Sequence, residues 1–211
     1  NNIPVATIGT LGLKYNGRVI KSKLTSPDTI TLHKALEKIK KEKIDNVLIE
    51  ASSHGLDQKR LDHLNIKAGI FTNFSQDHLD YHKTMSSYFN SKMYLFKKIL
   101  PKKKTIICDK SIKEFPKIKA IARRKKIYLI DIKDVKEKLI NTKDLRFNEF
   151  QLKNLSMAII AAKLFKLSEK KIFKSLNKLN DVNGRLELVR TFSNNIKVFV
   201  DFAHTPDALI K

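Results

Sequence analysis

Short apolar runs that alternate with stretches of helical periodicity constrain the fold of this 211-residue chain more than any other feature. Four such runs have the length of a strand rather than a helix: 47–49, 68–72, 105–109 and 127–130. Between them, apolar side chains recur at helical spacing, as they do from Leu32 to Ile39. Strands that alternate with helices form a mostly parallel sheet with helices on both faces. We therefore predict an α/β fold with a mostly parallel, doubly wound sheet.

Turn and capping signals add detail toward the two ends of the chain. A strand is expected over 5–10, and the Asn16-Gly17 pair predicts a hairpin turn after it. We expect Thr29 to cap the first helix. The remaining expected elements are helices over 86–100, 112–125, 154–167 and 168–179, and strands over 186–191 and 196–200.

Polar residues directly follow two of the apolar runs. The segment EASSHGLDQKR follows the buried strand expected at 47–49, and the segment NFSQDHLDYH follows the run at 68–72. In an open α/β sheet, ligands bind beyond the carboxyl ends of the strands. Because both segments carry side chains that can hold metals and phosphates, we predict that they contribute to one shared site.

Lys92 lies within the apolar stripe of the helix expected over 86–100, four residues after Tyr88 and three before Leu95. The simpler interpretation is a lysine whose aliphatic stem packs while its ammonium group reaches water. The alternative is that desolvation favours the free amine, which could then react with carbon dioxide. Spacing alone favours the first interpretation.

The charge balance raises the question of nucleic acid, because 43 Lys and Arg against 21 Asp and Glu give a formal charge of +22. The basic residues are spread along the whole chain, and aromatic residues do not interleave with them as in a stacking groove. We therefore expect no nucleic-acid partner and keep a basic nucleic-acid-binding module as an alternative. No apolar run approaches the roughly 20 residues of a membrane span. No signal peptide opens the chain, so we expect a cytoplasmic protein. Cys108 is the single cysteine, which excludes an internal disulfide, and we expect it to be buried.

Four motifs, in this order, give the chain a resemblance to the Mur ligases, the ATP-dependent ligases of peptidoglycan synthesis. They are EASSHGLDQKR at 50–60, FTNFSQDHLDYH at 71–82, GRLE at 184–187 and VDFAHTPD at 200–207. The resemblance covers nearly the whole chain, and the SSHGLxQxR string favours the members that add the third residue of the stem peptide. Folylpolyglutamate synthase, a related ligase, is the alternative enzyme, and this string argues against it.

The resemblance implies a P-loop-type central domain that binds ATP and Mg²⁺. A carboxylate of the UDP-N-acetylmuramoyl dipeptide would be phosphorylated, and the amine of a diamino acid, which we expect to be meso-diaminopimelate, would attack the acyl phosphate. By this resemblance the catalytic and metal-binding residues would be Glu50, His78 and Lys92. Lys92 matches the family's carbamylated lysine, and a carbamate supplies the oxygen donors that suit Mg²⁺.

The same resemblance assigns two further groups of residues. The substrate-binding residues would be Thr25, Ser26, Ser52, Gln58 and Arg60. The ATP-binding residues would be Asn73, Asn154, Arg185, Asp201 and His204. Ser26 stands where the family commonly has threonine, and Phe202 where it commonly has tyrosine.

Several polar residues near these motifs keep two interpretations. Asn73 and Asp77 could instead be loop residues that hold the backbone, and His54 and His82 could be structural or functional. We expect His33 and His63 to be surface residues.

We expect residues 1–189 to be the central domain and 190–211 to begin a C-terminal α/β domain. The chain contains no Gly-x-x-x-x-Gly-Lys-Ser/Thr loop. The first strand and phosphate-binding loop of the central domain are therefore expected to precede Asn1. We expect the chain to be monomeric and catalytically silent on its own.

Overall fold

The computed structural model describes residues 3–141, 148–179, 182–205 and 208–209. The chain divides into two compact units, one made of residues 1–74 and 78–161 and the other of residues 75–77 and 162–211. The predicted boundary after residue 189 stays a prediction, and the predicted motif residues Pro206 and Asp207 lie outside the described residues.

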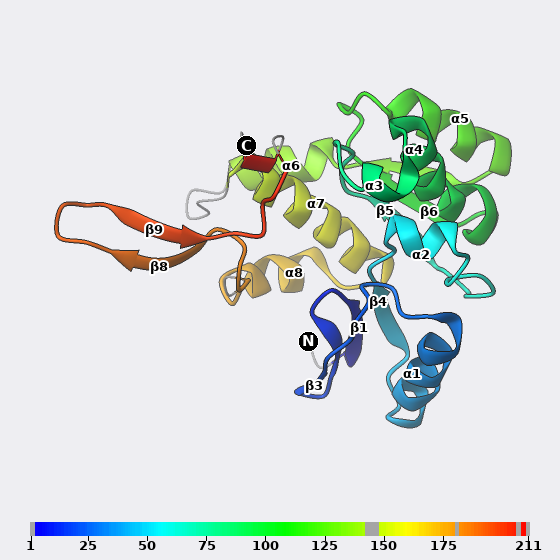
Figure 1. The fold of residues 1–211 in the computed structure, drawn as a ribbon, viewed down its shortest axis with the longest axis horizontal. Coiled ribbons are helices and arrows are strands. Elements are labelled where there is room, and N and C mark those ends of the chain that lie inside the picture. Colours follow the sequence, from blue (N-terminus) through cyan, green and yellow to red (C-terminus); the bar gives the residue numbers. More distant parts are fainter. Residues whose placement is uncertain (1–2, 142–147, 180–181, 206–207, 210–211) are drawn as a thin grey trace. The chain divides into compact units, whose positions relative to one another are not determined.

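The first unit begins with a four-stranded sheet in the order β3-β2-β1-β4 (Figure 1). Its strands are β1 (Val5–Gly9), β2 (Gly12–Tyr15), β3 (Arg18–Ile20) and β4 (Asn46–Ile49). β1, β2 and β3 pair antiparallel, whereas β4 pairs parallel with β1. The predicted hairpin turn is confirmed, because Asn16 and Gly17 both have positive φ, at 47° and 73°, between the paired residues Tyr15 and Arg18.

Two predictions about this region are wrong in detail. The strand at 47–49 is not fully buried, because β4 lies at the end of the described sheet and Leu48 is 50% exposed. Helix α1 (Thr29–Lys41) is capped by Asp28 rather than Thr29, since the Asp28 carboxylate accepts the Thr31 N–H at 3.0 Å. The predicted helix itself is confirmed, and Leu32 and Ile39 are buried on its inner face.

A second sheet in the same unit is fully parallel, with the order β5-β6-β7. Its strands are β5 (Ala68–Phe71), β6 (Thr105–Cys108) and β7 (Tyr128–Asp131). All four residues of the central strand β6 are buried. Burial, together with the charges of Asp131 and Asp109, raises the pKa of Cys108 to about 12, so this thiol behaves as the buried apolar residue that we predict.

Helices pack around these sheets and connect their strands. They are α2 (Ser53–Asp57), α3 (Leu79–His82), α4 (Met85–Tyr94), the π-helix η1 (Leu95–Ile99), α5 (Phe115–Lys125) and α6 (Lys133–Ile140). The helix predicted over 86–100 is therefore α4 passing into η1, where the Leu100 N–H bonds the Leu95 carbonyl at 2.8 Å. α5 begins three residues later than predicted, next to Pro116, a residue favoured in a first helical turn.

Helix α7 (Glu149–Leu164) crosses the division between the units. The second unit also contains α8 (Glu169–Leu176) and the antiparallel pair β8 (Glu187–Thr191) and β9 (Lys197–Val200), drawn in yellow to red in Figure 1. Ser168 caps α8 by accepting the Lys171 N–H. None of the helices in the described residues is long and apolar enough to cross a bilayer.

Candidate functional site

Glu50 is held at the end of β4 by its parallel neighbour β1. Ile8 pairs with Ile49, and the Glu50 N–H bonds the Ile8 carbonyl at 2.8 Å. This register brings the Glu50 carboxylate to Thr10, whose backbone N–H and hydroxyl donate to Oε2 at 2.8 and 2.9 Å. A Cβ at Gly9 would lie 2.6 Å from the same oxygen, so a side chain at this position would displace the carboxylate.

Ser26 connects Glu50 to the start of α2. It is 1% exposed, and its hydroxyl donates to the Glu50 carbonyl at 2.8 Å. The same oxygen accepts the Ser52 N–H at 2.9 Å and the Ser52 hydroxyl at 3.0 Å. Ser52 also caps α2 by accepting the Gly55 N–H at 3.1 Å, and the Thr25 hydroxyl lies 3.1 Å from that of Thr10. Three of the predicted substrate-binding residues therefore form one cluster with Glu50.

Arg60 and Gln58 extend this cluster along α2. The Arg60 Nη1 donates to the Ser26 carbonyl at 2.7 Å, and its Nε donates to the Gln58 side-chain oxygen at 3.0 Å. Gln58 in turn donates to the Tyr81 hydroxyl at 3.2 Å. All five predicted substrate-binding residues thus belong to one hydrogen-bonded network that reaches Glu50.

Imidazole and phenol rings from three helices gather beside this network. The His54 ring lies 4.9 Å from that of His78, 4.3 Å from that of Tyr81 and 5.4 Å from that of His82. His78 starts α3 in the left-handed conformation, with φ 53° and ψ 28°. Ten other described non-glycine residues of this chain also have positive φ, so this conformation does not by itself mark His78 as functional.

Lys92 and His78 meet at the same ring. The Lys92 ammonium nitrogen is 4.9 Å from the centroid of Tyr88, and the His78 ring centroid is 5.7 Å from it. Lys92 is half-buried on α4, and its ammonium group lies over the Tyr88 ring. His78 and Lys92 thus both lie near the Tyr88 ring, and Glu50 belongs to the hydrogen-bonded network described above.

The ligand atoms that Glu50, His78 and Lys92 offer decide whether these residues suit the predicted Mg²⁺. Within the described ranges of the chain, no three His, Cys, Asp or Glu side chains are arranged to hold a metal ion. Glu50 and His78 are donors of these types, whereas an unmodified lysine ammonium has no lone pair to offer. The residues fit Mg²⁺ only if Lys92 carries the predicted carbamate.

A buried polar relay supports the ring cluster. His82 is 5% exposed, and its Nε2 and Nδ1 lie 3.0 Å from the Ser53 hydroxyl and 3.4 Å from the Ser91 hydroxyl. Ser91 donates to Asp57 at 3.1 Å. Burial, reinforced by the charge of His78 at His54 and of His54 at His82, lowers the pKa of both imidazoles. These contacts hold His82 in place within the cluster.

The predicted ATP-binding residues fall in both units. In the second unit, the Arg185 guanidinium lies 5.0 Å from the Phe202 ring, and Asp201 accepts the N–H groups of Leu186 and Ala203 at 2.6 Å each. His204 lies 2.8 Å from the Phe202 carbonyl through Nδ1. In the first unit, Asn73 follows β5 and Asn154 lies on α7, and both are exposed.

Sequence reasoning missed three members of the site. Thr10 holds the Glu50 carboxylate, and Asp57 accepts hydrogen bonds from Ser91 and, at 2.9 Å, from the Tyr81 hydroxyl. Thr10 follows an apolar strand, as Glu50 does, so the sequence contained the signal. Asp57 and Tyr81 lie within the polar segments at 50–60 and 71–82, but their contact depends on the packing of the helices, which the sequence does not specify.

Comparison with known proteins adds family evidence. A family model described as the Mur ligase middle domain matches residues 2–179. A UDP-N-acetylmuramoyl-L-alanyl-D-glutamate--2,6-diaminopimelate ligase of Leptospira interrogans is 33% identical over 96% of this chain and 45% of its own length. The ligase of the same name from Rickettsia bellii is 35% identical over 98% of this chain and 48% of its own length. The chain thus spans about half the length of these curated relatives.

Comparison with solved structures gives the same family relationship. A structure of a ligase of the same name superposes with a TM-score of 0.75 at 25% identity, over 98% of this chain and 46% of that one. A mutant of L. casei FPGS superposes with a TM-score of 0.68 at 13% identity, which shows a shared fold alone. The predicted α/β class is confirmed, and the chain belongs to the Mur ligase family, whose middle domain its residues 2–179 match.

Proposed function

We propose that these residues act as the central domain of an ATP-dependent ligase that adds a diamino acid, meso-diaminopimelate, to UDP-N-acetylmuramoyl-L-alanyl-D-glutamate. The names of the relatives support this substrate pair. The observation that carries the proposal is the continuous network that joins Glu50 to Arg60 through Ser26 and Ser52.

The proposed reaction forms an amide in two steps. The substrate carboxylate attacks the terminal phosphorus of ATP and ADP leaves, and the amine then attacks the acyl carbon and inorganic phosphate leaves. Both steps need negative charge to be neutralised close to the phosphates, which bound Mg²⁺ supplies. Glu50 and His78 offer it one oxygen and one nitrogen donor, and a Lys92 carbamate would add further oxygens.

The chain's own residues would orient the dipeptide substrate. The Arg60 guanidinium, held in place by the Ser26 carbonyl and the Gln58 amide, presents a planar fork that suits a carboxylate or a phosphate. The hydroxyls of Thr25 and Ser52 lie at the edge of the same network. Substrate binding would therefore be coupled to the position of Glu50 through Ser26.

Phosphate release by the complete product of the gene that encodes these residues tests the proposal. ATP, the UDP-linked dipeptide and meso-diaminopimelate together should give turnover, and replacing the diamino acid with L-lysine should reduce it. Lys92→Ala should lower the rate by at least about 100-fold, the effect of losing one preorganised electrostatic group. Lys98→Ala, an exposed lysine six residues away on η1, is the matched control. Equal rates for the Lys92 variant and its control would refute the proposed role of the site.

A further inference from the structure

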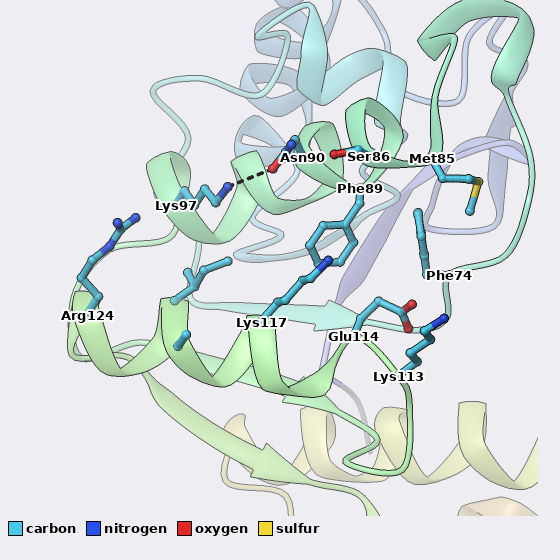
Figure 2. A pocket seen from close by; sticks show the side chains of 12 residues that line it. Phe74, Met85, Ser86, Phe89, Asn90, Lys97, Lys113, Glu114, Lys117 and Arg124 are labelled. Atoms are coloured by element: carbon cyan, nitrogen blue, oxygen red, sulfur yellow. Dashed lines mark hydrogen bonds between the residues drawn. The ribbon is translucent and has the colours of Figure 1, made fainter.

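A groove on the first unit is lined by none of the residues of the site described above. It lies between α4 and η1 on one side and α5 on the other, and its volume is about 820 Å³ (Figure 2). Pockets that hold small organic ligands measure about 300–1,000 Å³. The groove is therefore large enough for a small molecule of its own.

Apolar side chains form the floor of the groove. The Phe74 and Phe89 rings lie 5.3 Å apart at 71°, an edge-to-face arrangement, and Met85, Ala120 and Ile121 complete the lining. Figure 2 shows Phe74 and Phe89 facing the space between the helices. An aromatic or branched apolar group bound here would be shielded from water and could stack against these rings.

Basic side chains form the walls. Lys97 comes from η1, Lys113 precedes α5, and Lys117 and Arg124 lie on α5, whereas Glu114 is the one acidic residue of the lining. Among the residues that the structure describes, none of these four cations forms an ion pair with an acidic side chain. Four basic side chains against one acidic side chain thus give the groove a net positive charge above its apolar floor.

Two of these cations already contact groups inside the groove. The Lys117 ammonium lies 5.3 Å from the centre of the Phe89 ring, and the Lys97 ammonium donates to the Asn90 side-chain oxygen at 3.1 Å. Figure 2 shows Lys117 extending from α5 toward Phe89, whereas Lys97 runs along the opposite wall toward Asn90. An anion held between them would gain charge-assisted hydrogen bonds from both sides.

We propose that this groove binds a small amphipathic anion, a molecule with an aromatic or branched apolar body and a carboxylate, phosphate or sulfonate group. The apolar body packs on Phe74 and Phe89, and the anionic group lies between Lys97 and Lys117. Neither part of the groove would select such a ligand alone, because lysines are common on this surface and apolar floors accept neutral molecules. Their juxtaposition gives the selectivity.

Fluorescence titration with 8-anilinonaphthalene-1-sulfonate, an aromatic anion, tests the proposal. The double variant Lys97→Glu with Lys117→Glu should weaken binding by at least roughly tenfold, since it removes two charge-assisted contacts. The double variant Lys119→Glu with Arg123→Glu, which makes the same total change of charge at exposed positions on α5 outside the groove, should have little effect. Equal weakening by the control would show that net charge governs binding and would overturn the proposal.

Amide chemical shifts locate the bound probe and so distinguish binding in the groove from binding at other exposed apolar residues. Phe89, Asn90 and Lys117 should shift together during the titration, whereas shifts confined to β8 and β9 would contradict the proposal. Phenyl phosphate and phenylacetate should both displace the probe, and their relative potency distinguishes a phosphate from a carboxylate ligand. Displacement by acidic phospholipid vesicles or duplex DNA, with none by either small anion, would also overturn it.

Discussion

Substitution of Gly55 by alanine tests whether the Ser26 cluster is as tightly packed as the structure shows. A Cβ at residue 55 would lie 2.6 Å from the Ser26 Cβ, 2.8 Å from its Oγ and 3.1 Å from the Ser52 Oγ. These distances are far below ordinary van der Waals contact. Ser26 has no room to retreat, because it is 1% exposed and fixed by hydrogen bonds to Glu50 and Ser52.

The expected cost is a balance of three contributions. Overpacking a filled site costs about 1–3 kcal/mol, and weakening a hydrogen bond of Ser26 adds about 0.5–1.5 kcal/mol. Replacing glycine by alanine within a helix returns up to about 1 kcal/mol. With about 2 and 1 kcal/mol lost and about 1 kcal/mol returned, the net loss is about 2 kcal/mol, which corresponds to a Tm decrease of about 4–8 °C for a chain of this size.

Thermal unfolding of the 211-residue chain measures this loss, and Ser26→Gly provides the matched background. Removing the Ser26 side chain removes the clash, so Gly55→Ala should cost little or even stabilise the protein in that background. An undiminished cost in both backgrounds would place the strain elsewhere. No change in Tm for the single substitution would refute the packing argument.

Three further predictions concern the core and the ring cluster. Gly69→Ala should destabilise the chain by about 1–3 kcal/mol, because its Cβ would lie 2.7 Å from the buried Phe96 ring; urea unfolding measures this, and an unchanged midpoint would contradict it. Burial lowers the pKa of His54 and His82 in the folded state, so as the pH falls the unfolded chain binds protons at these two sites at a higher pH than the folded chain does. The free energy of unfolding should have its full value above about pH 6.5 and should decrease as the pH falls from there through the folded-state pKa values of the two histidines. A Tm that does not change between pH 7 and pH 5 would contradict the burial of these imidazoles. Because the pKa of Cys108 is raised to about 12, the native thiol should react with a disulfide reagent only after unfolding, and fast native labelling would contradict that.

Local sequence signals predicted the helices, strands and turns well where the backbone preferences of single residues determine the conformation. The Asn16-Gly17 turn forms as predicted, because these residues tolerate positive φ. The helix predicted over 86–100 is present, but apolar spacing could not show that it changes to a π-helix at Leu95. Both helix forms bury Leu95 and Phe96, so the apolar pattern does not distinguish them.

The site was predictable as a set of residues and less so as an arrangement. Ser52, Gln58 and Arg60 come from the motif at 50–60, whereas Thr25 and Ser26 lie outside the four motifs, and the structure joins these segments through Ser26. The contact between Thr10 and Glu50 depends on the register of β1 against β4, which pairs residues 41 positions apart in the sequence. The Asp57 contact with Tyr81 depends on helix packing, which residue spacing does not specify.

The central claim is that Glu50, His78 and Lys92 serve one divalent cation site. Paramagnetic broadening by Mn²⁺ in bicarbonate buffer tests it directly, because Mn²⁺ replaces Mg²⁺ at oxygen-rich sites and broadens nearby nuclear resonances. The resonances of all three residues should broaden together at the lowest Mn²⁺ concentrations, and Lys92→Ala should abolish the effect at His78 whereas Lys98→Ala should not. Broadening that begins elsewhere, or that persists at His78 in the Lys92 variant, would contradict the claim.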